Sequence, residues 1–195
     1  MMVGAILTQA TNWRSAERAI NRLRAAGALG PRRLLAVPGA RLERLIRPAG
    51  YFRQKAKRLR GYTRWYIERY RGEARRMFRT APLRLRHELL QVPGVGPETA
   101  DAILLYAGGK PAFVVDAYTE RVFRRHRVIR RGATYDEIQR LAMQRLPADA
   151  ALFNEFHALL VAVGKRCCHR SAPDCAHCPL GDLPRTLEGS IHGKR

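Results

Sequence analysis

Asp116 is the residue of this chain best suited to acid–base or electrostatic catalysis. It follows the apolar residues 113–115, which would limit its access to water. A carboxylate in such a position can stabilise a developing positive charge or activate a water molecule. It can also act as the N-cap of a helix predicted over residues 118–125. The two roles are compatible, so Asp116 is the candidate catalytic residue.

A glycine-rich turn, Val92-Pro-Gly-Val-Gly-Pro-Glu-Thr-Ala100, separates two helical runs at residues 83–91 and 99–107. Its glycines permit backbone angles that side chains disfavour, and they allow close approach of a partner. The start of the second helix offers N–H groups that favour an anion. In a basic chain the expected anion is a nucleic-acid phosphate. A turn between two helices that binds no ligand is the alternative.

All four cysteines lie between positions 167 and 178. Such clustering favours a metal site in a reducing compartment over a disulfide framework. Six residues separate Cys168 from Cys175, and two separate Cys175 from Cys178. A zinc site that uses Cys and His, or a degenerate motif without metal, remain alternatives to an iron–sulfur cluster.

The charge indicates a nucleic-acid partner. The net charge is +21 and the pI is about 11.2, and such an excess repels itself unless polyanions neutralise it. The charge is spread over the whole chain, which disfavours a membrane-surface role. No apolar run is long enough for a membrane-spanning helix. The first residues lack a basic region and a cleavage signature, so we do not expect them to be a signal peptide.

Helical periodicity runs through almost the entire sequence, and we predict an all-α fold. Asn12 is the expected cap and Gly27 the expected stop of an early helix whose apolar positions are Trp13, Ala16, Ile20 and Leu23. A break is expected at Gly61. The last long apolar face, over residues 152–163, should close at Gly164. Thr134 and Glu137 have the spacing of a capping box, and the polar tail from Leu183 is expected to fray.

Four motifs in this order resemble the endonuclease III (HhH-GPD) superfamily of DNA glycosylases. They are Ile6-Leu-Thr-Gln9, Gly50-Tyr-Phe-Arg-Gln-Lys-Ala-Lys-Arg-Leu59, the hairpin followed by Asp116, and the cysteine cluster. The resemblance is closest to the monofunctional 3-methyladenine type. It implies a two-domain helix-hairpin-helix fold, with residues 1–110 containing the hairpin (about 83–107) and residues 111–195 carrying the cysteines. The abrupt apolar opening resembles an internal helix of that fold, so we expect an N-terminal segment to be lacking.

The resemblance also implies a function in base excision repair. The enzyme would bind double-stranded DNA, flip a damaged base out of the stack and hydrolyse its glycosidic bond, with Asp116 as the catalytic acid. Gln9 would fill the gap in the duplex. The DNA-binding residues would be Gln9, Val92, Gly94, Val95, Gly96 and Thr99. We expect a monomer in the cytoplasm, associated with the nucleoid, and no membrane partner.

Glu98 occupies the position at which bifunctional members of this family carry a lysine. That lysine forms a Schiff base with the sugar, which a carboxylate cannot do. We therefore expect base removal by water without efficient strand cleavage. A bifunctional glycosylase with lyase activity, a mismatch-specific glycosylase and a non-catalytic helix-hairpin-helix DNA-binding protein are the alternatives.

The family's cysteine motif implies a [4Fe–4S] cluster held by four thiolates. Cys168, Cys175 and Cys178 match that motif, but Pro184 stands where the fourth cysteine is expected. Cys167 is a possible substitute, as are His169 and His177. We assign no catalytic role to His157, Lys165 or Arg166, and we expect Tyr106 to lie in the core.

Overall fold

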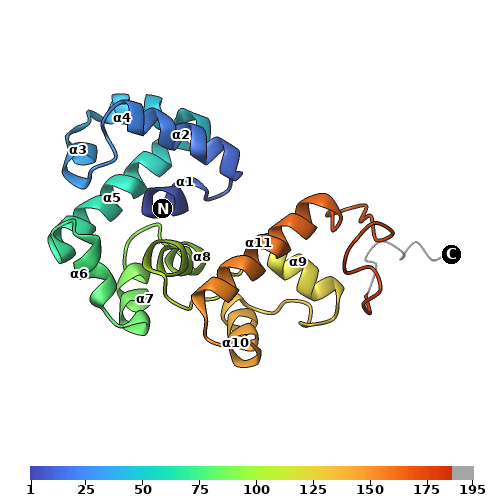
Figure 1. Ribbon diagram of the computed structural model, residues 1–195. Coiled ribbons are helices and arrows are strands. Elements are labelled where there is room, and N and C mark those ends of the chain that lie inside the picture. Colours follow the sequence, from blue (N-terminus) through green and yellow to red (C-terminus); the bar gives the residue numbers. More distant parts are fainter. Residues whose placement is uncertain (186–195) are drawn as a thin grey trace. The chain divides into compact units, whose positions relative to one another are not determined.

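The computed structural model describes residues 1–185, and within them it contains helices but no strand (Figure 1). The predicted all-α class is confirmed. The chain divides into two compact units, Met1–Lys110 (unit 1) and Pro111–Arg195 (unit 2). No helix of the described residues is both long and apolar enough to cross a membrane.

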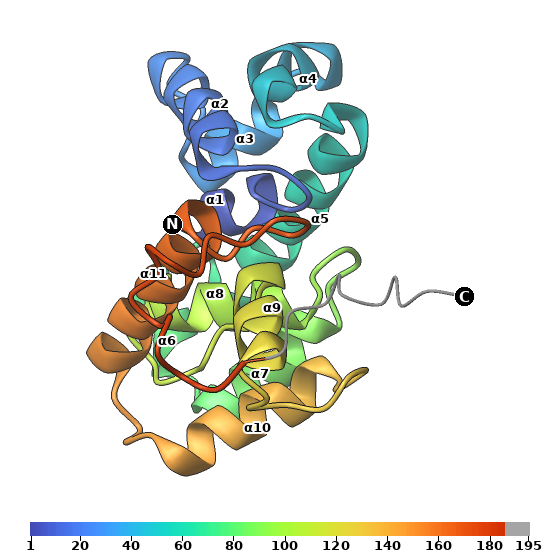
Figure 2. The same cartoon turned by 90° about the vertical axis from the view of Figure 1, so that its right-hand side faces the viewer.

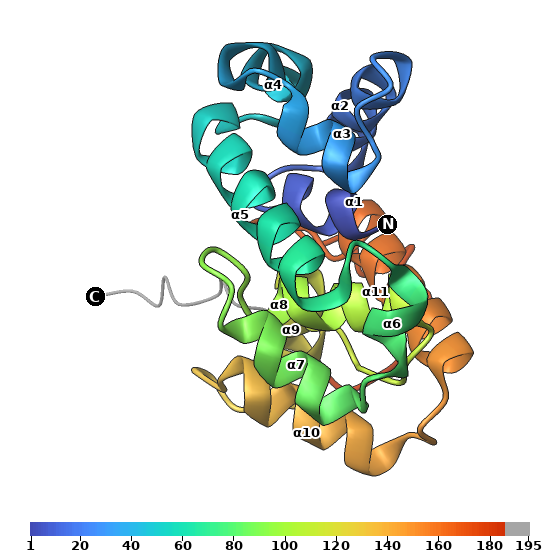
Figure 3. The same cartoon turned by 90° about the vertical axis from the view of Figure 1, so that its left-hand side faces the viewer.

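Unit 1 is built around the long helix α5, against which α1, α3 and α4 pack (Figure 3). Its helices are α1 (Met2–Leu7), α2 (Trp13–Ala25), α3 (Pro31–Ala36), α4 (Gly39–Ile46), a 3₁₀ turn (Arg47–Ala49), α5 (Phe52–Tyr70), α6 (Ala74–Arg79), α7 (Pro82–Leu90), α8 (Pro97–Ala102) and a π-helical turn, η2 (Ile103–Ala107). Apolar side chains such as Ile6, Leu23 and Leu59 are fully buried between them.

Local signals start and stop α2 as predicted. The side chain of Asn12 accepts a hydrogen bond from Ser15 N–H at 2.9 Å, which satisfies one of the amide groups that a helix start leaves without an intrahelical acceptor. Gly27 has a φ of 65° just beyond the helix end, a conformation that glycine adopts without strain.

The break expected at Gly61 is wrong, because α5 is continuous from Phe52 to Tyr70. A glycine inside a helix costs about 1 kcal/mol relative to alanine. Leu59, Tyr62 and Tyr66, which flank Gly61, are buried. Burying side chains of this size stabilises a helix by more than that cost.

The two helices of the hairpin, α7 and α8, are joined by a buried ion pair. Arg86 donates to both oxygens of Asp101, at 2.8 and 3.1 Å, and the Asp101 side chain is fully buried. A bidentate, desolvated contact of this kind fixes the angle between its two helices more firmly than an exposed pair does. The second helical run begins at Pro97, two residues before the predicted start, and it changes to π-helical geometry at Ile103.

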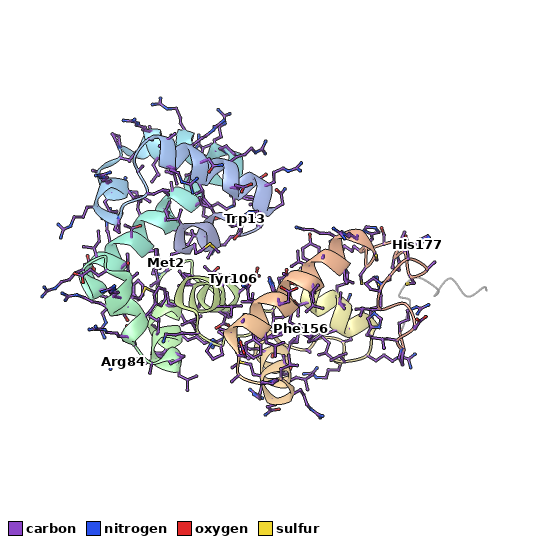
Figure 4. The ribbon with its side chains drawn as sticks, viewed as in Figure 1. Met2, Trp13, Arg84, Tyr106, Phe156 and His177 are labelled. Atoms are coloured by element: carbon purple, nitrogen blue, oxygen red, sulfur yellow. The ribbon has the colours of Figure 1, made fainter. Side chains whose placement is uncertain are left out.

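Unit 2 contains three helices within its described part, α9 (Ala117–Arg125), α10 (Tyr135–Arg145) and α11 (Ala150–Arg166). The capping box at the start of α10 is confirmed, with both reciprocal bonds present between Thr134 and Glu137. The core is an aromatic cluster. The ring centroid of Phe113 lies 5.5 Å from that of Phe153 and 5.7 Å from that of Phe156, which is labelled on α11 in Figure 4.

Helices α9 and α11 pack side by side (Figure 2), and Gly164 is the residue that allows it. A Cβ atom at this position would lie 2.4 Å from Cδ1 of Tyr118. The predicted helix stop at Gly164 is therefore wrong: α11 continues to Arg166, and the glycine serves close helix packing.

One expectation near the start of the chain, that Trp13 is buried, differs from the structure. The first helix buries Gly4, Ile6 and Leu7, but Met1 is exposed. Trp13, placed on the buried face of α2 by periodicity, is 45% exposed because it stands at the first position of the helix (Figure 4). The tail expected to fray lies, beyond Arg185, outside the described residues.

Candidate active site and nucleic-acid interface

Asp116 lies at the N-terminus of α9 and caps it. Its Oδ1 accepts a hydrogen bond from Thr119 N–H at 2.8 Å. The preceding residues, Phe113 to Val115, are buried, and only 15% of the Asp116 side chain is exposed. The structure thus gives Asp116 the capping role and the poorly solvated surroundings that the sequence suggested.

His157, on α11, faces the other carboxylate oxygen of Asp116. Its Nε2 lies 3.6 Å from Oδ2, and 14% of the His157 side chain is exposed. Burial by itself raises the pKa of Asp116, but the facing His157 side chain and the hydrogen bond from Thr119 N–H outweigh this effect, so the pKa is lowered from its ordinary value. Asp116 is therefore an anion at neutral pH. Sequence reasoning gave His157 no role, because nothing local connects it with Asp116.

The hairpin turn is shaped around Gly94. Its φ is 85°, and a Cβ atom there would lie 2.5 Å from Cγ of Arg58. Gly96 differs: its φ is −92°, and nothing lies within 4 Å of a Cβ atom built on it. Gly94 is therefore required by the fold of the turn, whereas Gly96 leaves open space at the start of α8.

Gln9 ties this turn to the rest of unit 1. Its Nε2 donates to Gly94 O and to Thr99 Oγ1, each at 2.9 Å. Its Oε1 accepts a hydrogen bond from Nη1 of Arg58 at 2.7 Å. The structure thus brings three of the residues expected at the DNA, Gln9, Gly94 and Thr99, together in one hydrogen-bonded cluster.

The side chains of the other hairpin residues expected at the DNA face the interior of unit 1, so the motif offers mainly its backbone to a partner. Val92, Val95 and Thr99 are buried, and the Val95 N–H already donates to Val92 O at 3.0 Å. The first intrahelical bond of α8 runs from Ala100 N–H to Gly96 O. The N–H groups in the first turn of α8, which have no intrahelical acceptor, are therefore the part of this motif that best suits an anion.

Lys55 is a buried lysine that sequence reasoning did not single out, although it belongs to the motif that begins at Gly50. Its side chain is 1% exposed, and its Nζ donates to Leu7 O at 2.9 Å and to Ala49 O at 2.7 Å. Burial, and secondly the charge of Arg58, lower its pKa to about 8. Lys55 links the end of α1 to the segment before α5, and its amine is held by these two carbonyl groups inside unit 1.

We expect Gly94→Ala to destabilise the protein and to weaken duplex binding. An L-residue at this φ costs about 1–2 kcal/mol, and the added Cβ must also displace Arg58 from Gln9. Affinity should fall for damaged and undamaged duplexes alike, if the backbone amides of the hairpin bind phosphate and not bases as we expect. Denaturant unfolding and fluorescence anisotropy at several salt concentrations measure both effects. Gly96→Ala is the matched control, with a smaller loss of stability; a loss confined to lesion DNA would contradict this role.

Glu98 lies in the first turn of α8 and is exposed. A carboxylate at a helix N-terminus interacts favourably with the helix dipole. The sequence contains no lysine between Lys57 and Lys110. The hairpin of this chain therefore presents an acid where an amine would be needed for covalent chemistry.

Tyr51 is a further residue to which the sequence pattern gave no role. It precedes α5 with a φ of 43° and is 70% exposed. A non-glycine residue in this region is unusual, and a large exposed aromatic side chain can stack on a base. Tyr106, expected in the core, is half-buried in η2, whereas Lys165 and Arg166 are exposed at the end of α11.

The cysteines line a common small cavity in unit 2. Cys167 and Cys168 are buried, and Cys175 and Cys178 are half-buried. Arg125, itself 6% exposed, donates from Nη1 to Sγ of Cys168 at 2.9 Å. A buried guanidinium directed at sulfur suits a thiolate.

The side-chain donors on this cavity are four free thiols. Burial, and secondly Cys178, raise the pKa of the Cys167 thiol, which points toward His177 O at 3.5 Å. Within the described part of the chain, no three His, Cys, Asp or Glu side chains are grouped as ligands of one metal ion. Each thiolate of a [4Fe–4S] cluster binds a separate iron, so its ligands need not converge on a single point.

Comparison with known proteins agrees with this architecture. Residues 3–148 match the HhH-GPD superfamily of base excision DNA repair proteins. A candidate DNA repair glycosylase of Methanocaldococcus jannaschii is 47% identical over 185 residues, which are 94% of this chain and 83% of that protein.

Two solved structures are similar in fold. An endonuclease III in a non-covalent complex with DNA has a TM-score of 0.80 and 28% identity, over 94% of this chain and 81% of that one. The Helicobacter pylori 3-methyladenine DNA glycosylase bound to 1,N6-ethenoadenine has a TM-score of 0.73 and 27% identity, over 85% of this chain and 83% of that one. The chain belongs to the HhH-GPD superfamily, and it is a base excision repair DNA glycosylase.

Proposed function

We propose that this glycosylase is monofunctional and that it hydrolyses the glycosidic bond of a damaged base in double-stranded DNA. The observation that carries the proposal is the environment of Asp116, a carboxylate that is only 15% exposed and whose pKa is lowered by the facing His157 and by the hydrogen bond from Thr119 N–H. Such a group keeps its negative charge in surroundings of low polarity, where electrostatic stabilisation is strongest.

The reaction requires little covalent participation by the protein. The bond between C1′ and the base nitrogen breaks, the electron pair leaves with the base, and positive charge develops on the sugar. Asp116 stabilises that charge. A water oxygen then bonds to C1′ and loses a proton, while the base gains one, so the products are the free base and an abasic site.

Glu98 supports hydrolysis over lyase chemistry. A lyase step needs an uncharged amine that attacks C1′, and the hairpin offers a carboxylate at the relevant position. The buried Lys55 is held by two carbonyl groups. A bifunctional enzyme would therefore have to bring its amine from a residue outside the hairpin.

An oligonucleotide panel tests the function directly. Purified protein is incubated with duplexes that carry alkylated, deaminated, oxidised or mismatched bases, and products are resolved with and without alkali. Cleavage that appears only after alkali indicates monofunctional base release; cleavage without alkali indicates a lyase. Binding without base release on every duplex would favour the non-catalytic DNA-binding alternative.

The geometry of unit 1 supports a proposal for the contacts with DNA. The first turn of α8 and the open space at Gly96 favour a backbone phosphate, and Gln9 and Tyr51 are candidates for contacts near the flipped base. To fill the gap in the duplex, Gln9 would have to exchange its bonds to Gly94 and Thr99 for bonds to the orphaned base. We propose a monomer that acts on nucleoid DNA in the cytoplasm.

The cysteine cavity supports a [4Fe–4S] cluster held by Cys168, Cys175, Cys178 and Cys167. Pro184 has no ligand atom in its side chain, whereas the thiol of Cys167 is buried on the same cavity. The cluster would stabilise the C-terminal loop of unit 2. The positive charge of Arg125 would offset the negative charge of the thiolates.

We expect the protein purified without oxygen to be brown, with about four irons per chain. Cys167→Ser should lower the iron content and the melting temperature. Pro184→Cys restores the usual fourth ligand and should rescue iron binding in the Cys167→Ser background. Iron analysis and visible absorption measure these changes; colourless protein with one zinc, or with no metal, would contradict the assignment.

A further inference from the structure

We propose that His157 is the positioning residue of Asp116, and that it holds the second carboxylate oxygen in its reactive orientation. This inference rests on the proposed hydrolysis at Asp116. Thr119 N–H occupies Oδ1 at 2.8 Å, while Nε2 of His157 stands 3.6 Å from Oδ2. The two partners approach the carboxylate from different helices, α9 and α11.

The approach of His157 is fixed by rigid packing and not by a flexible loop. Gly164 admits Tyr118 of α9 against α11. Arg121 of α9 donates to Gly164 O at 3.0 Å and to Cys168 O at 2.7 Å. These contacts tie the C-terminal part of α11 to α9, and His157 lies two helical turns before Gly164 on the same helix.

The hydrogen bond from Thr119 N–H to Oδ1 does not by itself determine the orientation or the protonation of the Asp116 carboxylate. A carboxylate bonded through one oxygen can still rotate about its Cβ–Cγ bond, and burial favours its protonated form. An N–H group directed at Oδ2 opposes both effects. An imidazole that carries a proton on Nε2 would do so.

This role requires no proton transfer by His157. The imidazole orients the carboxylate, Asp116 stabilises the developing charge on the sugar, and the protons move as described for hydrolysis. A loss of orientation should therefore slow base release and leave duplex affinity almost unchanged. The expected loss is roughly tenfold to a hundredfold, the scale on which misplaced catalytic groups act.

The test compares His157→Leu, His157→Gln and the control Asn154→Leu, which introduces the same side chain at an exposed position of α11. Single-turnover base release and duplex Kd are measured on the substrate that the wild-type protein accepts. We expect His157→Leu to lose at least tenfold in the rate of base release, with its duplex Kd within threefold of wild type. His157→Gln should recover part of the rate, because its amide can donate a hydrogen bond over a similar distance. Asn154→Leu should keep the wild-type rate. In the Asp116→Asn background, His157→Leu should cause no further loss.

A rate for His157→Leu within twofold of wild type, or equal losses with Leu and Gln, would overturn the inference. A second readout does not depend on activity. In ¹H–¹⁵N spectra of the imidazole ring, the Nε2–H proton of His157 should be observable in wild type and lost to exchange in Asp116→Ala; if it is unchanged by that substitution, His157 does not bond to Asp116. If the wild-type protein releases no base, the proposed function is refuted instead. The spectra then still test whether His157 bonds to Asp116.

Discussion

Asp116→Asn is expected to reduce the rate of base release by a factor of 10² to 10⁴, the usual contribution of a positioned acid or base, while duplex binding is retained. The substitution removes the negative charge and changes the volume little. Asparagine is as good an N-cap as aspartate, so the hydrogen bond from Thr119 N–H and the start of α9 should persist. Single-turnover assays and thermal melts separate loss of chemistry from loss of structure.

Asp149→Asn is the matched control, because Asp149 caps α11 by accepting from the N–H groups of Ala151 and Leu152. It should leave base release unchanged.

The pKa of Asp116 is lowered, so the charge is present above the unfolded-state value and is lost only as pH falls through the lower folded-state value. Base release by wild type should therefore not decline through this group between pH 5 and 8. If Asp116→Asn stays within a few-fold of wild type, Asp116 is only a cap.

Glu98→Lys is expected to create a covalent activity that a monofunctional wild-type protein would lack. Borohydride should not trap wild type efficiently on abasic-site DNA, and strands should break only after alkali. A lysine at this position places an amine in the first turn of α8, where bifunctional relatives carry theirs. Trapped complex, counted by denaturing electrophoresis, should rise from background to a measurable fraction. The lysine opposes the helix dipole, at a cost of about 0.3–1 kcal/mol.

Glu98→Gln removes the charge without supplying an amine and should not trap. This control shows whether the gained activity comes from the amine or from loss of the carboxylate. Efficient trapping by wild type would refute the monofunctional proposal, and Lys110 would then be the first residue to replace. Lys55 is a poorer suspect despite a pKa of about 8, because its Nζ is buried against Leu7 O and Ala49 O.

The sequence determined the features that arise from local chemistry. Helical periodicity and the absence of alternating patterns indicated the all-α class. The caps at Asn12 and Thr134 were readable because a side chain and its amide partner lie only three residues apart. The order of motifs identified the superfamily. Glu98 raised the question of lyase chemistry, because one residue type decides whether an imine can form.

The tertiary structure decided whatever depends on residues distant in the sequence. Periodicity cannot show that Gly61 is flanked by buried side chains, or that Gly164 makes room for Tyr118. The buried pair of Arg86 with Asp101 and the bonds of Gln9 to Gly94 and Thr99 join segments that only folding brings together. His157 reaches Asp116 because α9 and α11 pack closely, and this contact helps keep the buried carboxylate charged.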